Sequence, residues 1–307
     1  MKLPVCIVFL FLVACGTNPE TPYSDTPTSG KVNIGADETL LKLADAQLDT
    51  FHGLYRYASI NMLYKPEAEL FKMLLDDSVK VIMSARPLNA AEESYFKSRN
   101  LIPVSTRVAV DALAIIINKA NPDSLMSLNQ LGKILNGEAD NWKSVFPGSA
   151  LGKISFVFDN NGSSTVRYLN DSLMKTDAFP EWCFAAKSNE DVIKYVESNP
   201  SAMGIIGVSW ISDEDDAAVK DFLTRIKVMA LSRTDSGNAD DYFKPYQAYI
   251  SLNDYPLTRD IYMISREGRA GLGTGFVSFV AGDQGQRIIR LMGLLPATMP
   301  VRIIKTQ

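Results

Sequence analysis

The sequence predicts an α/β protein, in which short apolar strands alternate with amphipathic helices from residue 31 onward. Residues 108–118 form a long, strongly apolar run, which is typical of a strand buried on both faces. A helical pattern starts at Pro66, and an apolar strand at 79–84 follows it. Residues 153–158 are a further apolar strand, followed by a polar turn and a helix. These strands and helices predict a sheet covered by helices.

The other elements follow from the same patterns. The chain before residue 150 predicts a strand at 32–36, a helix at 39–54, and a helix that Ser127 caps and Gly137 ends. The helix after residue 163 carries apolar residues facing inward, namely Val166, Leu169 and Leu173. Asn189 is expected to cap the next helix. Further strands are expected at 203–208, 226–231 and 255–265.

Two further segments complete the pattern, one acidic and the other apolar. The acidic run at 213–216 is expected at a helix start, where carboxylates favour the positive end of the helix dipole. It lacks the glycine and the alternating oxygen ligands of a calcium loop. C-terminal helices are expected around five apolar residues, namely Phe276, Phe279, Ile288, Ile289 and Met292.

Composition restricts the class of protein. The chain has 307 residues, of which 46% are hydrophobic, and a net charge of -4. This is ordinary for a soluble globular protein, long enough for two lobes, and it argues against a nucleic-acid partner, which needs a basic face. Three cysteines (Cys6, Cys15 and Cys183) and one histidine, His52, give no basis for a disulfide framework, a metal site or a Ser-His catalytic pair. We expect no cofactor.

The N-terminus has the pattern of a targeting segment. Residues 1–14 combine Lys2 with a short apolar run at 5–13, too short for a permanent membrane helix. Cys15 follows directly, as in a bacterial lipobox, and predicts lipidation at this cysteine. The alternative is a plain secretory signal with a chance cysteine. Residues 15–31 are rich in Pro, Thr, Ser and Gly and are predicted to be a flexible tether. Together these features predict a cell-envelope protein, lipid-anchored to a membrane and facing the periplasm or the cell exterior.

A hydroxyl-rich turn at 160–165 is the clearest candidate for a binding site. Gly162 permits a tight turn, and Ser163, Ser164 and Thr165 surround the start of a helix. Free backbone N–H groups and the helix dipole at such a start suit a small oxyanion. A simple helix cap is the alternative explanation.

Two more polar loops follow predicted strands. Ser84 and Arg86 lie at the end of the 79–84 strand, and Thr39 and Leu40 lie where the first strand meets its helix. In open α/β sheets, ligands bind outside these carboxyl ends. Arg86 offers a planar fork of donors to an oxyanion, although an interlobe or surface arginine would look the same.

Taken in order, these loops resemble the phosphate-binding proteins of ABC importers, the PstS-like group of type II periplasmic binding proteins. The resemblance covers most of residues 31–300. Its motifs are the segments 35–39, 84–88, 111–114 with 118–122, 128–131 with 136–137 and 141–142, 162–165, 204–207, 255–259 and 285–286. It implies two lobes, each a mixed sheet flanked by helices, joined by two hinge-crossing strands. Lobe 1 would combine 31–109 with 256–307, and lobe 2 would span 110–255.

The resemblance also implies a site and partners. Phosphate or a similar small oxyanion would lie between the lobes, held by Thr39, Leu40, Ser84, Arg86 and the 162–165 loop, and an ABC permease would receive it. The chain departs from the pattern at Asp159, where the family often has an arginine, at Ala85, and at Lys65 in the loop before the second helix. Carboxylates at Asp37, Glu38 and Asp159 would repel a dianion unless Arg86, Lys65 or Arg167 compensates.

Two other functions remain open at the level of the sequence. One is a lipoprotein that keeps this fold but binds another ligand, or acts as a sensor or adaptor. The other is an enzyme that uses the hydroxyl-rich loop. Because no plausible base accompanies that loop, we expect a binding protein and no catalytic residues.

Overall fold

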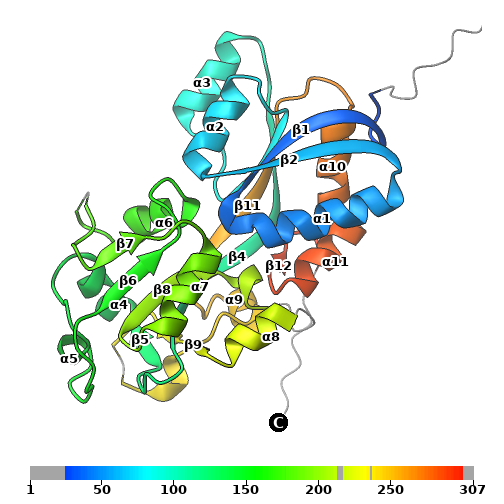
Figure 1. The fold of residues 1–307 in the computed structure, drawn as a ribbon. Helices are drawn as coiled ribbons and strands as arrows, with labels where there is room; N and C mark the ends of the chain where they lie inside the picture. Colours follow the sequence, from blue (N-terminus) through cyan, green and yellow to red (C-terminus); the bar gives the residue numbers. More distant parts are fainter. Residues whose placement is uncertain (1–24, 177, 213–216, 236, 300–307) are drawn as a thin grey trace, which may run out of the picture.

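A long strand, β4 (Val104–Asn118), organises the protein. The computed structural model describes residues 25–176, 178–212, 217–235 and 237–299. The first part of β4, as far as Ala112, pairs antiparallel with β11 (Thr258–Ser265), and the part from Leu113 pairs antiparallel with β8 (Ala202–Gly207). The strand order is β2-β1-β3-β11-β4-β8-β6-β7. The predicted α/β fold with a strand that crosses between two lobes is therefore confirmed (Figure 1).

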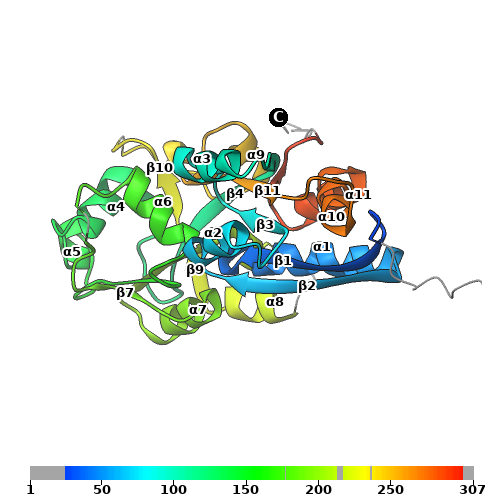
Figure 2. The same ribbon diagram turned by 90° about the horizontal axis from the view of Figure 1, so that it is seen from above.

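Lobe 1 lies on one side of this crossing. Its parallel strands are β1 (Ser29–Asp37), β2 (Tyr57–Lys65) and β3 (Val81–Ser84), and β11 joins β3 antiparallel. The helices around this sheet are α1 (Leu41–Leu54), α2 (Glu67–Leu75), α3 (Ala90–Ser98), α10 (Leu272–Ala281) and α11 (Asp283–Leu291). Figure 2 shows α10 and α11 on one side of the long β1 and β2 strands. Strand β2 was not predicted from the sequence, because this edge strand is only partly buried and lacks a continuous apolar run.

Lobe 2 is built on β8, β6 (Ser155–Phe158) and β7 (Cys183–Ala185), which are parallel to one another, and on β9 (Ile226–Val228), which pairs with β4. Its helices are α4 (Leu128–Leu135), α5 (Trp142–Val145), α6 (Ser164–Ser172), α7 (Asn189–Ser198), α8 (Ala217–Leu223) and α9 (Gln247–Ser251). A separate pair joins β5 (Leu125–Ser127) to β10 (Ala230–Ser232). The single strand predicted at 226–231 is thus two strands in two sheets.

Short elements connect these layers. They are the 3₁₀ turns η1 (Glu38–Leu40), η2 (Val208–Trp210) and η3 (Ala239–Asp241), and the short strand β12 (Leu295–Pro296), which pairs with β4. The acidic run at 213–216 lies outside the described residues.

Helix caps follow the sequence closely. Ser127 accepts a hydrogen bond from the Gln130 backbone N–H, as predicted. The cap of α7 is Ser188, one residue before the predicted Asn189, because the Ser188 hydroxyl accepts the Asp191 backbone N–H. The shift is small and physically simple, since serine caps as well as asparagine does.

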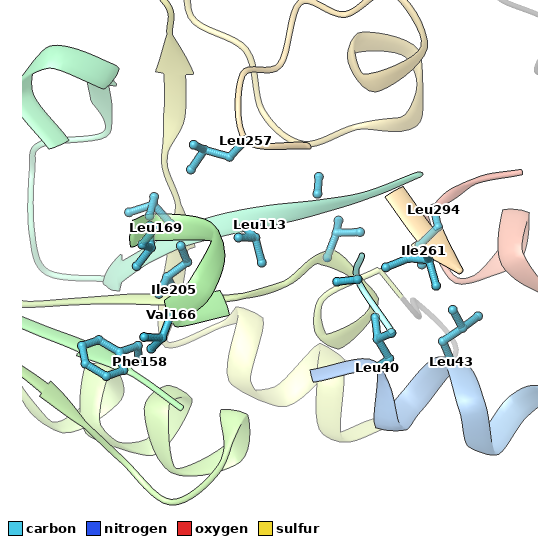
Figure 3. Packing of buried hydrophobic residues seen from close by; sticks show 14 of the residues in the cluster. Leu40, Leu43, Leu113, Phe158, Val166, Leu169, Ile205, Leu257, Ile261 and Leu294 are labelled. Atoms are coloured by element: carbon cyan, nitrogen blue, oxygen red, sulfur yellow. The ribbon is translucent and has the colours of Figure 1, made fainter. Parts of the chain in front are cut away.

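The hydrophobic core continues across the junction between the lobes. In Figure 3, Leu113 of β4 lies between Ile205 of β8 on one side and three lobe 1 residues on the other, namely Leu40, Leu43 and Ile261. All five are fully buried members of one cluster. Two smaller clusters lie outside it, one under α7 and one between α2 and α3. The shared core holds the lobes in contact near the crossing strands.

The described structure begins before the predicted end of the tether. The Asp25 carboxylate accepts the Leu272 backbone N–H at 3.0 Å and pairs with Arg269 at 2.7 Å, and β1 starts at Ser29. Residues 25–31 therefore belong to the fold, a correction to the tether predicted for 15–31. The predicted signal segment and Cys15 lie outside the described residues. Across the described ranges, every helix is too short or too polar to span a bilayer.

The boundary between the lobes is also shifted. β4 exchanges β11 for β8 between Ala112 and Leu113, whereas the sequence analysis divided the chain at 109/110. The return crossing begins with β11 at Thr258, close to the division expected at 255/256.

Candidate functional site

Two strand ends, one from each lobe, meet beside the crossing strands. β1 ends at Asp37 and leads through η1 into α1, while β6 ends at Phe158 and leads into α6. The Thr39 and Ser164 hydroxyl oxygens lie 3.1 Å apart across this junction. Thr39, Ser163, Ser164 and Thr165 are all buried. The structure therefore brings together two of the three loops predicted to form the site.

Arg259 lies at the centre of this junction. Its guanidinium donates to Ser164 Oγ at 2.8 Å, to Thr39 Oγ1 at 3.0 Å, and through Nε to Asp111 Oδ2 at 2.9 Å. Arg259 comes from β11 and Asp111 from β4, the two crossing strands, and both are almost fully buried. One guanidinium thus contacts a hydroxyl from each lobe while the crossing strands hold it in place.

Arg259 was not among the site residues predicted from the sequence. Its signal was present, since this arginine ends the 255–259 motif on which the family resemblance partly rests. Periodicity and composition cannot show that a strand residue projects into the junction, because this depends on the pairing of β11 with β4, which sets Arg259 opposite Asp111. Arg259 places a buried positive charge at the junction, whereas position 159 carries an aspartate.

The hydroxyl pair has donor capacity to spare. Arg259 donates to both oxygens, and the Thr39–Ser164 contact uses the proton of only one hydroxyl. Each hydroxyl carries a single proton, so one O–H of the pair remains able to donate elsewhere. A guanidinium next to a free hydroxyl donor is suited to an oxyanion.

Buried carboxylates surround the same point. Asp37 Oδ1 accepts the Thr39 backbone N–H at 2.8 Å, and Asp159 Oδ1 accepts the Ser163 hydroxyl at 2.6 Å. Burial raises the pKa of Asp159 to about 7, the Ser163 hydroxyl opposes this shift, and the charge of Asp37 adds to it. Within the described residues, Asp37 Oδ2, Asp159 Oδ2 and Thr165 Oγ1 have no hydrogen-bond partner.

A second cluster occupies the space between α2 and α6. Arg167 donates to the buried Glu67 carboxylate and to the Ala85 carbonyl at 3.0 Å. Arg86 makes a two-pronged contact with Glu92, with both distances at 2.8 Å, and its guanidinium stacks 3.4 Å from the Phe71 ring centroid. Both arginines proposed from the sequence as anion donors are therefore already paired with carboxylates.

Glu67 is the residue that explains this pairing. It opens α2, accepts the Ala85 backbone N–H at 3.1 Å, and lies between Arg167 and Arg86, whose Nε is 3.7 Å away. Glu67 was not among the site residues predicted from the sequence, where only Lys65 of the same loop was singled out. Since Glu67 is in lobe 1 and Arg167 in lobe 2, their ion pair also links the lobes.

The other predicted residues take supporting positions. The Ser84 hydroxyl donates to the Arg86 carbonyl at 2.8 Å, and Leu40 is a core residue. Lys65 pairs with Glu69 at 3.0 Å, with both side chains about half exposed at 42% and 47%. Among the described residues, Arg259 forms its side-chain hydrogen bonds with Asp111, Ser164 and Thr39, and not with Ser84, Leu40 or Lys65.

Gly162 allows the lobes to approach closely. Its carbonyl accepts the Ala68 backbone N–H at 3.3 Å, and a Cβ at Gly162 would lie 3.3 Å from the Pro66 Cβ. Asn160 adds a further link to the Glu38 carboxylate at 2.9 Å. Trp210 of lobe 2 donates to the Thr39 carbonyl at 3.2 Å. Backbone and side chains of both lobes therefore meet directly in this arrangement.

These features define a two-lobed binding protein with a polar centre between the lobes. The family model of the PBP superfamily domain matches residues 21–284, so the chain belongs to this superfamily. The protein is similar to "Phosphate-binding protein PstS" of Borreliella burgdorferi, at 22% identity over 86% of this chain and 89% of the relative. It is also similar to "Protein SphX" of Synechococcus elongatus, at 20% identity over 90% of this chain and 80% of the relative.

Solved structures agree on the fold. A putative phosphate ABC transporter substrate-binding protein from Clostridium perfringens, solved with bound phosphate, has a TM-score of 0.73 and 18% identity, over 88% of this chain and all (100%) of that one. The reduced OxyR regulatory domain from Pseudomonas aeruginosa has a TM-score of 0.51 and 11% identity, over 81% of this chain and 98% of that one. The same fold therefore occurs in a transport receptor and in a regulator.

Proposed function

We propose that the protein is a solute receptor of an ABC importer that binds phosphate, or a similar small oxyanion, between its two lobes. The observation that carries the proposal is Arg259, which contacts Thr39 of lobe 1 and Ser164 of lobe 2 from a buried position. A ligand that replaces the direct contact between these hydroxyls would be held by both lobes. Such a ligand would favour closure by a hinge motion at β4 and β11.

The carboxylates favour an oxyanion that carries its own protons. Asp37 Oδ2 and Asp159 Oδ2 are buried acceptors without a partner among the described residues. Phosphate keeps at least one proton at neutral pH and can donate to such an oxygen, whereas sulfate has none and would meet only repulsion. We therefore propose phosphate over sulfate, with Thr39, Ser163, Ser164, Thr165 and Arg259 as the ligand set.

Arg86, Arg167 and Lys65 have a different part in this proposal. Glu67, Glu92 and Glu69 neutralise them, so they shape the rim, and the pair of Arg167 with Glu67 holds α2 against α6. Ser84, Leu40 and Gly162 support the loops through hydrogen bonding, packing and close backbone approach. This division of roles replaces the sequence-based proposal that Arg86 or Arg167 compensates the acidic residues.

A second candidate function is supported by the same neutralised arginines. A receptor that kept the fold but sensed another ligand would not need free cations at its rim, and a regulatory domain shares this fold. Calorimetry with phosphate, sulfate and molybdate separates the two. One-to-one phosphate binding at micromolar or tighter affinity, about -8 kcal/mol, supports the transport receptor. No heat and no thermal shift with phosphate would favour the second candidate.

The envelope location extends the proposal. The lipobox-like Cys15 is proposed to carry a lipid anchor that holds the receptor beside its permease. Mass spectrometry of the membrane-extracted protein should show a diacylated N-terminal cysteine, and Cys15→Ala should abolish that mass and release the protein from membranes. A protein that remains membrane-bound with Ala at this position would argue against the anchor.

A further inference from the structure

A cavity lies away from Arg259, between lobe 2 and the C-terminal part of lobe 1. Its volume is about 700 Å³. Lys119 lines it from just after the end of β4 and Lys227 from the middle of β9, and Arg290 and Leu291 line it from the end of α11. Gly293, at φ 79°, lies so close to Ser212 that a Cβ there would collide with the serine side chain. The cavity therefore has walls from both lobes.

The described residues that line this cavity carry charge of only one sign. Its described lining residues include four cations, and none of the described lining residues is acidic; the cations are Lys119, Lys227, Lys244 and Arg290. In the described part of the chain, none of the four forms an ion pair, although the Lys227 ammonium donates to the Asn121 carbonyl. A protein with a net charge of -4 thus gathers unpaired positive charge around one hollow.

The same cavity has an apolar surface. Leu125, Tyr246 and Leu291 line it and are exposed at 39%, 59% and 73%. Large apolar side chains gathered on a hollow surface are characteristic of ligand sites, and ligand pockets typically have volumes of about 300–1,000 Å³. An inorganic oxyanion would satisfy the cations but leave this apolar surface without a partner.

We propose that this cavity binds a small amphipathic anion, with a carboxylate or phosphate head near Lys244 and Arg290 and an apolar body against Leu125, Tyr246 and Leu291. The site shares no residue with the Arg259 centre. Because its walls come from both lobes, the bound anion contacts both and favours the lobe arrangement seen here. The protein would then respond to two ligands of different chemistry.

The test uses the purified full chain and decanoate, below its micelle-forming concentration, as the probe. Titration is followed by calorimetry in saturating inorganic phosphate, so that the Arg259 centre does not contribute. Decanol tests the need for charge, and acetate tests the need for the apolar body.

The variant Lys244→Gln/Arg290→Gln removes two cavity cations. Its matched control, Lys187→Gln/Arg287→Gln, removes two exposed cations, one of them from the same helix, α11, which do not line the cavity.

We expect saturable 1:1 binding of decanoate, and binding of decanol and acetate at least tenfold weaker. The cavity variant should weaken decanoate binding at least tenfold, while the control variant binds as the unmodified protein does. Equal binding of decanoate and decanol, or equal loss in the two variants, overturns the proposal. Binding only to vesicles with 20% phosphatidylglycerol in phosphatidylcholine, and not to decanoate, would show a membrane-docking surface and also overturn it.

Discussion

Two arginine clusters lie between the lobes, and they differ in what surrounds the guanidinium groups. Arg259 is almost fully buried, with one carboxylate partner and two neutral hydroxyls, one from each lobe. Arg86 and Arg167 lie nearer to solvent, at 21% and 29% side-chain exposure, and carboxylates take up their donors. The sequence singled out the second cluster, whereas the geometry favours the first.

The difference shows that an arginine in a predicted ligand loop indicates an anion site only when its hydrogen-bond partners are known. Glu67 and Glu92 turn Arg86 and Arg167 into a structural clamp, because a guanidinium bound to a carboxylate has little left to offer an anion. Thr39 and Ser164 are neutral and can rearrange around a ligand without leaving a charge unpaired.

The largest expected effect is on stability at the buried cluster. Arg259→Ala leaves Asp111 buried and unpaired and should lower the free energy of unfolding by about 3–5 kcal/mol. The exposed pair of Arg107 and Asp260, at 2.6 Å on the same two strands, provides the control. Arg107→Ala should cost about 0–1 kcal/mol. Urea denaturation measures both, and similar losses for the two variants would contradict the comparison.

The next effect concerns pH. Because burial raises the pKa of Asp159 to about 7, the folded state binds its proton more tightly than the unfolded state does. The bound proton contributes up to about 4 kcal/mol to the free energy of unfolding. This contribution is fully present at acid pH and is lost as pH rises from about 4 through 7. Asp159→Asn should remove this dependence. The stability difference between wild type and variant, measured from pH 4 to 8, should therefore change with pH; a constant difference would contradict the assignment.

A third effect concerns ligand affinity at the hydroxyl pair. Thr39→Val with Ser164→Ala removes two hydroxyls around Arg259 and should weaken phosphate binding about 10- to 100-fold, at about 1 kcal/mol or more for each lost hydrogen bond. Ser163→Ala with Thr165→Ala should also weaken binding strongly, and it should further destabilise α6 by about 1 kcal/mol through loss of its cap. Calorimetry and thermal unfolding separate the two effects. Unchanged affinity in both variants would place the ligand elsewhere.

The smallest effect is expected at the rim. Arg86→Gln should change phosphate affinity less than about threefold, because Glu92 and Glu67 already neutralise Arg86. The same titration measures this, with Thr39→Val/Ser164→Ala as the sensitive counterpart. A loss for Arg86→Gln as large as that of the hydroxyl variant would return Arg86 to the centre of the site.

Much of the fold could be predicted from the sequence, because apolar runs and caps are local signals. The strand at 108–118 and the cap at Ser127 are examples, and the loop at 162–165 lies at a helix start as expected. The edge strand β2 was missed because half-buried strands leave a weak pattern. The division of 226–231 into β9 and β10 depends on two different pairing partners, which no local pattern reveals.

The site was predicted in part, and the missing part has a physical reason. Thr39 and Ser164 come from loops that the sequence marks clearly, and the structure brings them together. Arg259 and Asp111 lie on strands whose sequence pattern gives no sign of a binding role, and Glu67 opens a helix, where acidic residues are common. Their roles depend on contacts between residues more than 90 positions apart, such as Arg259 with Ser164 or Glu67 with Arg167.

The most direct test of the central claim is phosphate titration of Arg259→Lys beside the unmodified protein. Lysine keeps the positive charge near Asp111 but loses the fork that reaches both hydroxyls. We predict one phosphate per chain at micromolar or tighter affinity for the unmodified protein, no measurable sulfate binding, and an affinity for phosphate about 100-fold weaker in the variant. Equal phosphate affinity in the two folded proteins would contradict the claim that Arg259 is the centre of the site.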